Sequence, residues 1–141
     1  MGTRMPAAVF RSFSVTLPES AYPDTRVAAR LRFDPALPYG VELAFPPHRP
    51  GGEEITWRFG RDLLAEGRLT PAGEGDVRVA PGPDGRILIT LGALGPQAER
   101  ALISTPDTAV AAFLAEAYTE VPPGTETAHL DLAPGLARLL A

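Results

Sequence analysis

The sequence predicts an α+β fold made of antiparallel sheets and helices. Short segments in which apolar and polar residues alternate are joined by turns rich in Pro, Gly and Asp, a pattern typical of antiparallel strands with one face in water. These segments are also grouped, with four before the first helical segment and about three before the second. Strict alternation of strands and helices would instead indicate a doubly wound parallel sheet.

The first half of the chain contains four predicted strands that follow one another through short turns. They cover residues 9–17, 25–33, 39–45 and 54–59. Every second side chain in them is apolar, with Arg11 the exception in the first, so one face of each strand is expected to be buried. The inward side chains include Tyr39 in the third strand and Ile55, Trp57 and Phe59 in the fourth. The arrangement favours an antiparallel meander.

A short helix and a hairpin are predicted next. Residues 61–66 suit about two helical turns, and Gly67 suits the left-handed position that ends a helix. The segment 73–75 predicts a turn, because it lacks the residues of a phosphate-binding loop. Residues 76–80 and 86–91 then predict a hairpin that turns on glycine and proline.

The last third of the chain predicts one more strand and two helices. The strand covers residues 98–104, and Thr105 followed by Pro106 is typical of a helix start. This helix is expected to continue to Tyr118, with one apolar stripe. Asp131 is expected to cap a final helix that carries several leucines on one side. The two halves of the chain therefore have a similar order of elements.

Length and composition indicate a single globular domain, 1–141. The hydrophobic fraction of 45% is enough for a core, and the absence of cysteine excludes disulfides and thiolate metal sites. No apolar run approaches the roughly 20 residues that cross a bilayer, so we expect no integral membrane segment and a cytoplasmic location. The net charge of −4 makes nucleic acid an unfavourable main partner.

The sequence offers little that resembles a catalytic or metal centre. His48 and His129 have no second histidine or cysteine at ligand spacing, so each is expected to be a surface residue. Asp62 and Glu66 share a helix face, but neighbouring arginines favour a solvated, charge-compensated surface over an acid–base pair. We therefore expect a protein without enzymatic activity and without a cofactor.

Three arginines on the second strand are the best nucleic-acid signal. Arg26, Arg30 and Arg32 share one face and span about 20 Å, enough to follow a few phosphates. Glu42 and Glu54 on neighbouring strands are expected to pair with them instead. This second interpretation is favoured.

Aromatic side chains bear on the same choice. Proteins that bind single strands usually offer aromatic rings on which bases stack. Phe33 lies on the opposite, buried face by alternation, so no exposed aromatic residue is expected among the arginines.

Several motifs nevertheless resemble a known family. They are WRFGRDLLAEG at residues 57–67 with PAGEGDV at 71–77, DP and PYGV at 34–41, VPPGTE at 121–126 and HLDL at 129–132. In this order they are similar to the SsgA-like proteins, the sporulation and cell division proteins of actinomycetes. The similarity extends from about residue 12 to residue 140.

The resemblance implies a function, a fold and an assembly. It implies a non-enzymatic adaptor in sporulation-specific cell division, located at the division septum. Such an adaptor would help to select the septum site by recruiting the tubulin-like protein FtsZ, or would control septal and spore-wall peptidoglycan. The resemblance also implies a Whirly-like architecture and a homo-oligomer, with a trimer favoured. Because Whirly proteins bind single-stranded nucleic acid, that activity is the alternative, although a shared fold alone does not transfer function.

Within the longest motif, the charged residues are the candidates for a partner-binding face. They are Arg58, Arg61, Asp62 and Glu66. Trp57 and Phe59 are expected to be core residues, because they share a strand face with Ile55.

Overall fold

The structure, a computed structural model, describes residues 5–47, 49–92 and 100–130. Its first layer is an antiparallel sheet in the order β1-β2-β3-β4. The strands are β1 (Val9–Val15), β2 (Val27–Phe33), β3 (Gly40–Phe45) and β4 (Ile55–Gly60). Consecutive strands are hydrogen-bonded neighbours, so the predicted meander is confirmed.

The second layer is a smaller antiparallel sheet in the order β5-β6-β7. Its strands are β5 (Val77–Pro81), β6 (Arg86–Gly92) and β7 (Arg100–Pro106). The turn between β5 and β6 uses positive φ angles at Asp84 and Gly85, as expected of a tight hairpin. The two sheets meet where Thr16, just after β1, exchanges backbone hydrogen bonds of 3.0 and 2.9 Å with Ser104.

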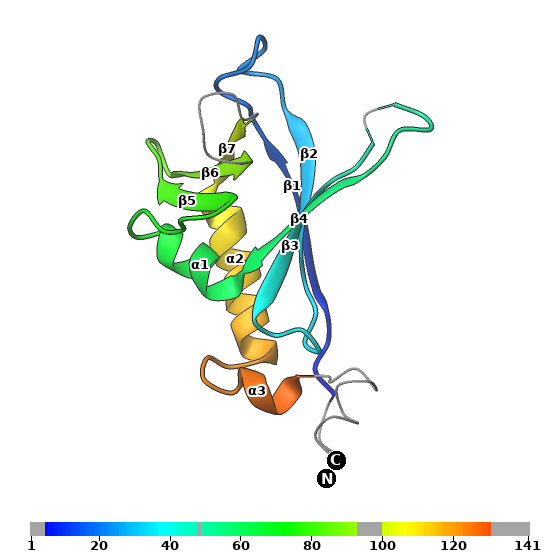
Figure 1. Cartoon of the computed structure of the whole chain (residues 1–141), viewed down its shortest axis with the longest axis vertical. Coiled ribbons are helices and arrows are strands. Elements are labelled where there is room, and N and C mark those ends of the chain that lie inside the picture. Colours follow the sequence, from blue (N-terminus) through cyan, green and yellow to red (C-terminus); the bar gives the residue numbers. More distant parts are fainter. Residues whose placement is uncertain (1–4, 48, 93–99, 131–141) are drawn as a thin grey trace.

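Three helices complete the described fold: α1 (Arg61–Gly67), α2 (Asp107–Glu120) and α3 (Glu126–His129). Figure 1 shows α2 lying along the inner side of the large sheet, with α3 beyond its end. Arg68 follows α1 and donates hydrogen bonds of 2.7 and 3.1 Å to the Asp107 carboxylate at the start of α2. These bonds lower the pKa of Asp107 below its usual value. None of the helices within the described residues is long and apolar enough to span a membrane.

The core lies between the large sheet, the small sheet and α2. It contains the inward side chains of all seven strands together with Leu64 of α1 and the apolar stripe of α2. The stripe consists of Val110, Phe113, Leu114 and Ala117, which are buried, and Tyr118, which packs partly against them. This stripe was predicted from the helical period and is confirmed.

The α+β class, the antiparallel sheets and the grouping of strands before helices are therefore confirmed. Each half of the chain is a meander followed by a helix. The predicted helix that begins at Asp131 lies outside the described residues. The short helix α3 was not predicted from the sequence.

Four local predictions are wrong. Thr105 and Pro106 do not begin a helix but end β7, because Thr105 pairs with Ile87 in the ladder with β6. Tyr39 precedes β3 and is half exposed, and Ile55 starts β4 with 58% of its surface exposed. Gly67 belongs to α1 and has no positive φ, so it does not act as a left-handed terminator.

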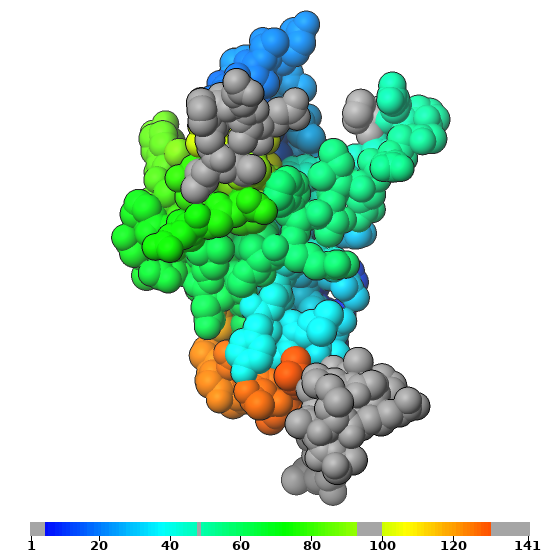
Figure 2. Space-filling model, in the orientation of Figure 1, coloured from blue at the N-terminus to red at the C-terminus, as the bar shows by residue number. Residues whose placement is uncertain are grey.

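The β3–β4 hairpin extends away from the rest of the molecule (Figure 1). The space-filling view shows its tip standing clear of both sheets (Figure 2). The hairpin thus places the far ends of β3 and β4, and the edge of β4, at the surface.

Candidate functional site

A chain of alternating charges crosses the outer face of the large sheet. Arg32 on β2 lies opposite Glu42 on β3, which in turn lies opposite Arg58 on β4. The ion pairs measure 3.8 Å from Asp34 to Arg32, 3.7 Å from Arg32 to Glu42 and 2.8 Å from Glu42 to Arg58. Register therefore produces a row of opposite charges that ends on the outermost strand.

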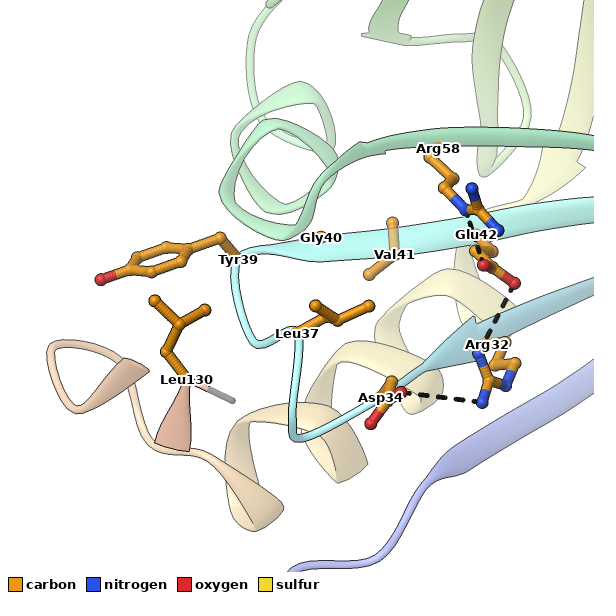
Figure 3. A pocket seen from close by; sticks show the side chains of 9 residues that line it. All are labelled: Arg32, Asp34, Leu37, Tyr39, Gly40, Val41, Glu42, Arg58 and Leu130. Carbon is orange, nitrogen blue, oxygen red and sulfur yellow. Dashed lines mark hydrogen bonds and ion pairs between the residues drawn. The ribbon is translucent and has the colours of Figure 1, made fainter. Parts of the chain in front are cut away.

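An apolar pocket of about 220 Å³ lies beside this row. Leu37 and Tyr39 from the β2–β3 turn, Val41 of β3 and Leu130 after α3 line it. Figure 3 shows these side chains on one side of the pocket and the charged row on the other. A concave apolar surface with a charged border is typical of a site that receives a side chain of another protein.

The pocket depends on the position of α3, because Leu130 follows that helix. Two contacts hold α3 in place. The hydroxyl groups of Tyr39 and Thr127 are hydrogen bonded to one another. In addition, Glu126 is buried and lies 3.7 Å from the guanidinium of Arg61.

Arg61 is therefore not part of an exposed face, and this candidate is corrected. Only 1% of its surface is exposed. Its guanidinium donates hydrogen bonds to the carbonyl oxygens of Ala117 and Val121 at 3.2 and 2.8 Å. It also stacks on aromatic rings, 4.9 Å from the centre of Phe33 and 4.2 Å from that of Tyr118. The buried guanidinium of Arg61 thus connects the end of α2 with Glu126 of α3.

The remaining candidates from the same motif do not form one site. Arg58 lies on the outer face of β4, whereas Asp62 and Glu66 are exposed on α1. Asp62 accepts a hydrogen bond of 2.9 Å from the hydroxyl group of Tyr118. Arg58 alone of these four borders the pocket, together with Arg32 from the nucleic-acid candidates.

The Tyr118 hydroxyl is expected to titrate unusually high. Burial and the hydrogen bond to Asp62 raise its pKa from 10.0 to about 12. Because the folded pKa lies above the unfolded one, this contribution to stability is complete below pH 10 and is lost as the pH rises towards 12. A spectrophotometric titration should resolve one tyrosine with this high midpoint, absent in Tyr118→Phe. A midpoint near 10 for every tyrosine would contradict the Asp62–Tyr118 contact.

Two of the three arginines proposed for nucleic acid, Arg30 and Arg32, are paired with carboxylates, as favoured above. Arg32 contacts Asp34 and Glu42, and Arg30 lies 3.7 Å from Glu54. Arg26 is exposed and precedes β2.

The expectation that no aromatic residue lies among these arginines is wrong. Phe10 is 53% exposed, and the guanidinium carbons of Arg30 and Arg32 lie 5.7 and 5.6 Å from its ring centre. Counting alternate positions from Val9 would have placed Phe10 on the outer face with Ser12.

The described residues contain no group of three or more histidine, cysteine or carboxylate side chains arranged to hold a metal ion. His129 is the last residue of α3 and is partly exposed, whereas His48 lies outside the described residues. What the outer face offers is an apolar pocket, a row of charges and an exposed aromatic ring.

Comparison with known proteins identifies relatives over nearly the whole chain. The family model of the Streptomyces sporulation and cell division protein SsgA matches residues 27–126. The sporulation-specific cell division protein SsgB of Streptomyces coelicolor is 43% identical over 124 residues, covering 87% of this chain and 86% of that protein. SsgB of Salinispora tropica is 42% identical over 115 residues, covering 82% and 80%.

Solved structures agree with this result. A structure from work on SsgB mutations that correlate with longitudinal cell division during sporulation of Streptomyces coelicolor has a TM-score of 0.74 and 38% identity, covering 92% of this chain and all of that one. The SsgA-like sporulation-specific cell division protein of Thermobifida fusca has a TM-score of 0.74 and 27% identity, covering 98% and 99%. The chain belongs to the SsgA family of sporulation and cell division proteins.

Proposed function

We propose that this protein is a non-enzymatic adaptor of sporulation-specific cell division that acts at the division septum. The names of its relatives support the process. The adaptor role is supported by the outer face of the large sheet, where the pocket beside Arg58 joins apolar surface to a charged border. Arginine and aromatic side chains around a small apolar depression are the composition that protein-binding surfaces favour.

The proposed partners are FtsZ, which the adaptor would recruit to the septum site, or proteins that build and cleave septal and spore-wall peptidoglycan. Arg58 and the pocket form the first candidate surface. Asp62 and Glu66 form a second, smaller one on α1. We further propose that the protein assembles with itself as a trimer, which sedimentation equilibrium of the purified chain would measure.

Co-sedimentation with FtsZ polymers from the same organism tests the adaptor proposal. The wild type is expected to pellet with the polymers, and Arg58→Glu to remain mostly in the supernatant because it reverses the charge at the pocket border. Arg78→Glu is the matched control, since Arg78 lies on β5 of the other sheet. A parallel deletion strain should form misplaced or missing sporulation septa. Normal septa in that strain, or equal pelleting of both variants, would contradict the proposal.

A second candidate, binding of single-stranded nucleic acid through a Whirly-like architecture, has one observation in its favour. Phe10 is exposed between Arg30 and Arg32, which is the arrangement of a stacking platform. However, three carboxylates lie among the arginines of this face. Phosphates would have to displace these carboxylates, so the first candidate is favoured.

Fluorescence anisotropy with labelled single-stranded DNA at low salt separates the two candidates. Because Arg30 and Arg32 beside Phe10 already lie next to carboxylates, we expect no binding at micromolar protein, and no difference between wild type and Phe10→Ala. Micromolar binding that weakens with salt and disappears in Phe10→Ala would instead establish the nucleic-acid function.

A further inference from the structure

In the part of the chain that the structure describes, β4 is the outermost strand of the large sheet. Within the described residues, the backbone of β4 pairs with β3 alone. The opposite edge strand, β1, is tied down, because Thr16 bonds to Ser104 and Arg11 to Glu116 of α2. β4 has an uninterrupted register with β3 over six pairs and contains no proline. Features that normally protect an edge strand, such as a bulge or a proline, are therefore missing from β4.

The hydrogen-bond pattern shows which groups of β4 point outward. The N–H of Arg61 donates to the carbonyl of Tyr39 at 2.8 Å, which continues the β3–β4 register by one pair. In an antiparallel ladder every second pair is hydrogen bonded, so Trp57 and Phe59 bond to β3. The N–H and C=O groups of Thr56 and Arg58 consequently point away from β3, towards the open edge.

The inner face of β4 borders a large apolar groove. The groove has a volume of about 920 Å³. It lies between the small sheet and the part of the large sheet next to the β3–β4 hairpin. Ile55 and Trp57 line it from β4, and Leu91 and Ile103 line it from β6 and β7. Side chains of a strand placed beside β4, opposite Ile55 and Trp57, would point towards this groove.

The outer face of β4 ends the charged row in a cation. Signs alternate from Asp34 through Arg32 and Glu42 to Arg58, as Figure 3 shows. The Arg58 side chain remains 78% exposed despite its bond to Glu42. A carboxylate opposite Arg58, on a strand next to β4, would continue the alternation of charges.

We propose that the edge of β4 is a strand-addition site for an extended segment of a partner protein. The segment pairs with the outward N–H and C=O groups of Thr56 and Arg58. Its side chains opposite Ile55 and Trp57 are apolar and enter the groove, and its side chain opposite Arg58 is acidic. The recognised pattern is thus apolar, polar, apolar, acidic along one extended strand. Main-chain bonds supply affinity and the alternate side chains supply specificity, as in other cases of β-augmentation.

This inference rests on the proposed adaptor function only in that the site binds another protein, so its test does not use FtsZ. The probe is a phage-displayed library of random dodecapeptides selected on the immobilised full chain. Enriched peptides are expected to show two apolar residues separated by one position, with an acidic residue directly beside one of them. Their synthetic forms are then measured by fluorescence anisotropy and by amide hydrogen exchange in NMR spectra.

Two variant pairs make the test specific. Thr56→Pro removes an outward N–H without removing a bond to β3, and Thr56→Val keeps that N–H. We expect Thr56→Pro to raise the Kd of the peptide about tenfold or more, because the loss of one hydrogen bond has an effect of that size. Thr56→Val should leave the Kd unchanged. Arg58→Glu should weaken binding of the acidic peptides by a similar factor, and Arg58→Gln by less. Circular dichroism checks that each variant is folded.

Hydrogen exchange supplies an independent readout. Peptide binding should slow exchange of the Thr56 and Arg58 amides, whereas the Trp57 and Phe59 amides, already bonded to β3, should change little. Failure to enrich any peptide, or enriched peptides whose binding ignores Thr56→Pro, would overturn the proposal. So would a change of oligomeric state in Thr56→Pro, since the edge would then join copies of this chain. If peptides bind as expected but the protein does not co-sediment with FtsZ, the strand-addition site is supported and FtsZ is excluded as its proposed partner.

Discussion

Arg61→Ala is expected to destabilise the protein by about 3–5 kcal/mol, the usual cost of removing one partner from a buried ion pair. Without the guanidinium, the carboxylate of Glu126 remains buried, and its Oε1 already lacks a hydrogen-bond partner. The carbonyl oxygen of Val121 loses the guanidinium as a donor, whereas that of Ala117 keeps only the N–H of Val121. The ring of Tyr118 also loses its cation. Urea unfolding followed by circular dichroism measures the change.

The matched variant removes both charges. Arg61→Met combined with Glu126→Met keeps most of the buried volume and leaves no unpaired ion, so it should recover at least half of the lost stability. Arg68→Met is the control, because its ion pair with Asp107 is one-third exposed and should cost much less. If Arg61→Ala costs less than about 1 kcal/mol, Arg61 is not the buried link between α2 and α3 described above.

The position of Arg61 could not be read from the sequence. Local pattern places an arginine next to Asp62 on a short helix, which indicates a solvated surface. The groups that make burial tolerable, at Val121 and Glu126, lie about sixty residues away. Only the tertiary fold brings Val121 and Glu126 to the Arg61 side chain, and no periodicity encodes that contact.

Other elements were predictable because their signal is local. The alternation in β2 placed Arg30 and Arg32 on one face and Leu31 on the other, as the structure confirms. The paired carboxylates were likewise predictable, because a meander fixes which strands are neighbours. Phe10 had the same signal, since it lies two residues from Ser12 and shares its outer face, but Arg11 places a charge on the inward face and interrupts the alternation.

Alternation fails where a strand has lost its facing layer. Ile55 has the parity of a core residue, yet at the start of β4 it faces the groove and 58% of its surface is exposed. Parity predicts which face a side chain takes but not whether anything covers that face. The groove proposed as part of the strand-addition site arises from this difference.

Gly67→Ala is expected to destabilise the protein although alanine is the better helix former. A Cβ atom at Gly67 would lie 2.3 Å from the Cβ and 2.4 Å from the Cγ1 atom of Val79 on β5, and 2.9 Å from its carbonyl oxygen. Part of this crowding involves the backbone of β5, so a side-chain rotation cannot relieve it. Inserting one carbon into so close a contact costs about 3 kcal/mol, against a gain of about 1 kcal/mol from helix propensity.

The sign of this change tests whether α1 packs on β5 as described. A net loss of about 2 kcal/mol in urea unfolding is expected. Gly75→Ala is the matched control, because no heavy atom lies within 4 Å of its added Cβ and its φ is not positive. That control should fall within about 0.5 kcal/mol of wild type. If Gly67 merely ended the helix, its replacement would disturb only the following turn and would leave the α1–β5 contact intact. Stabilisation by Gly67→Ala would therefore mean that α1 lies farther from Val79 of β5 than described here.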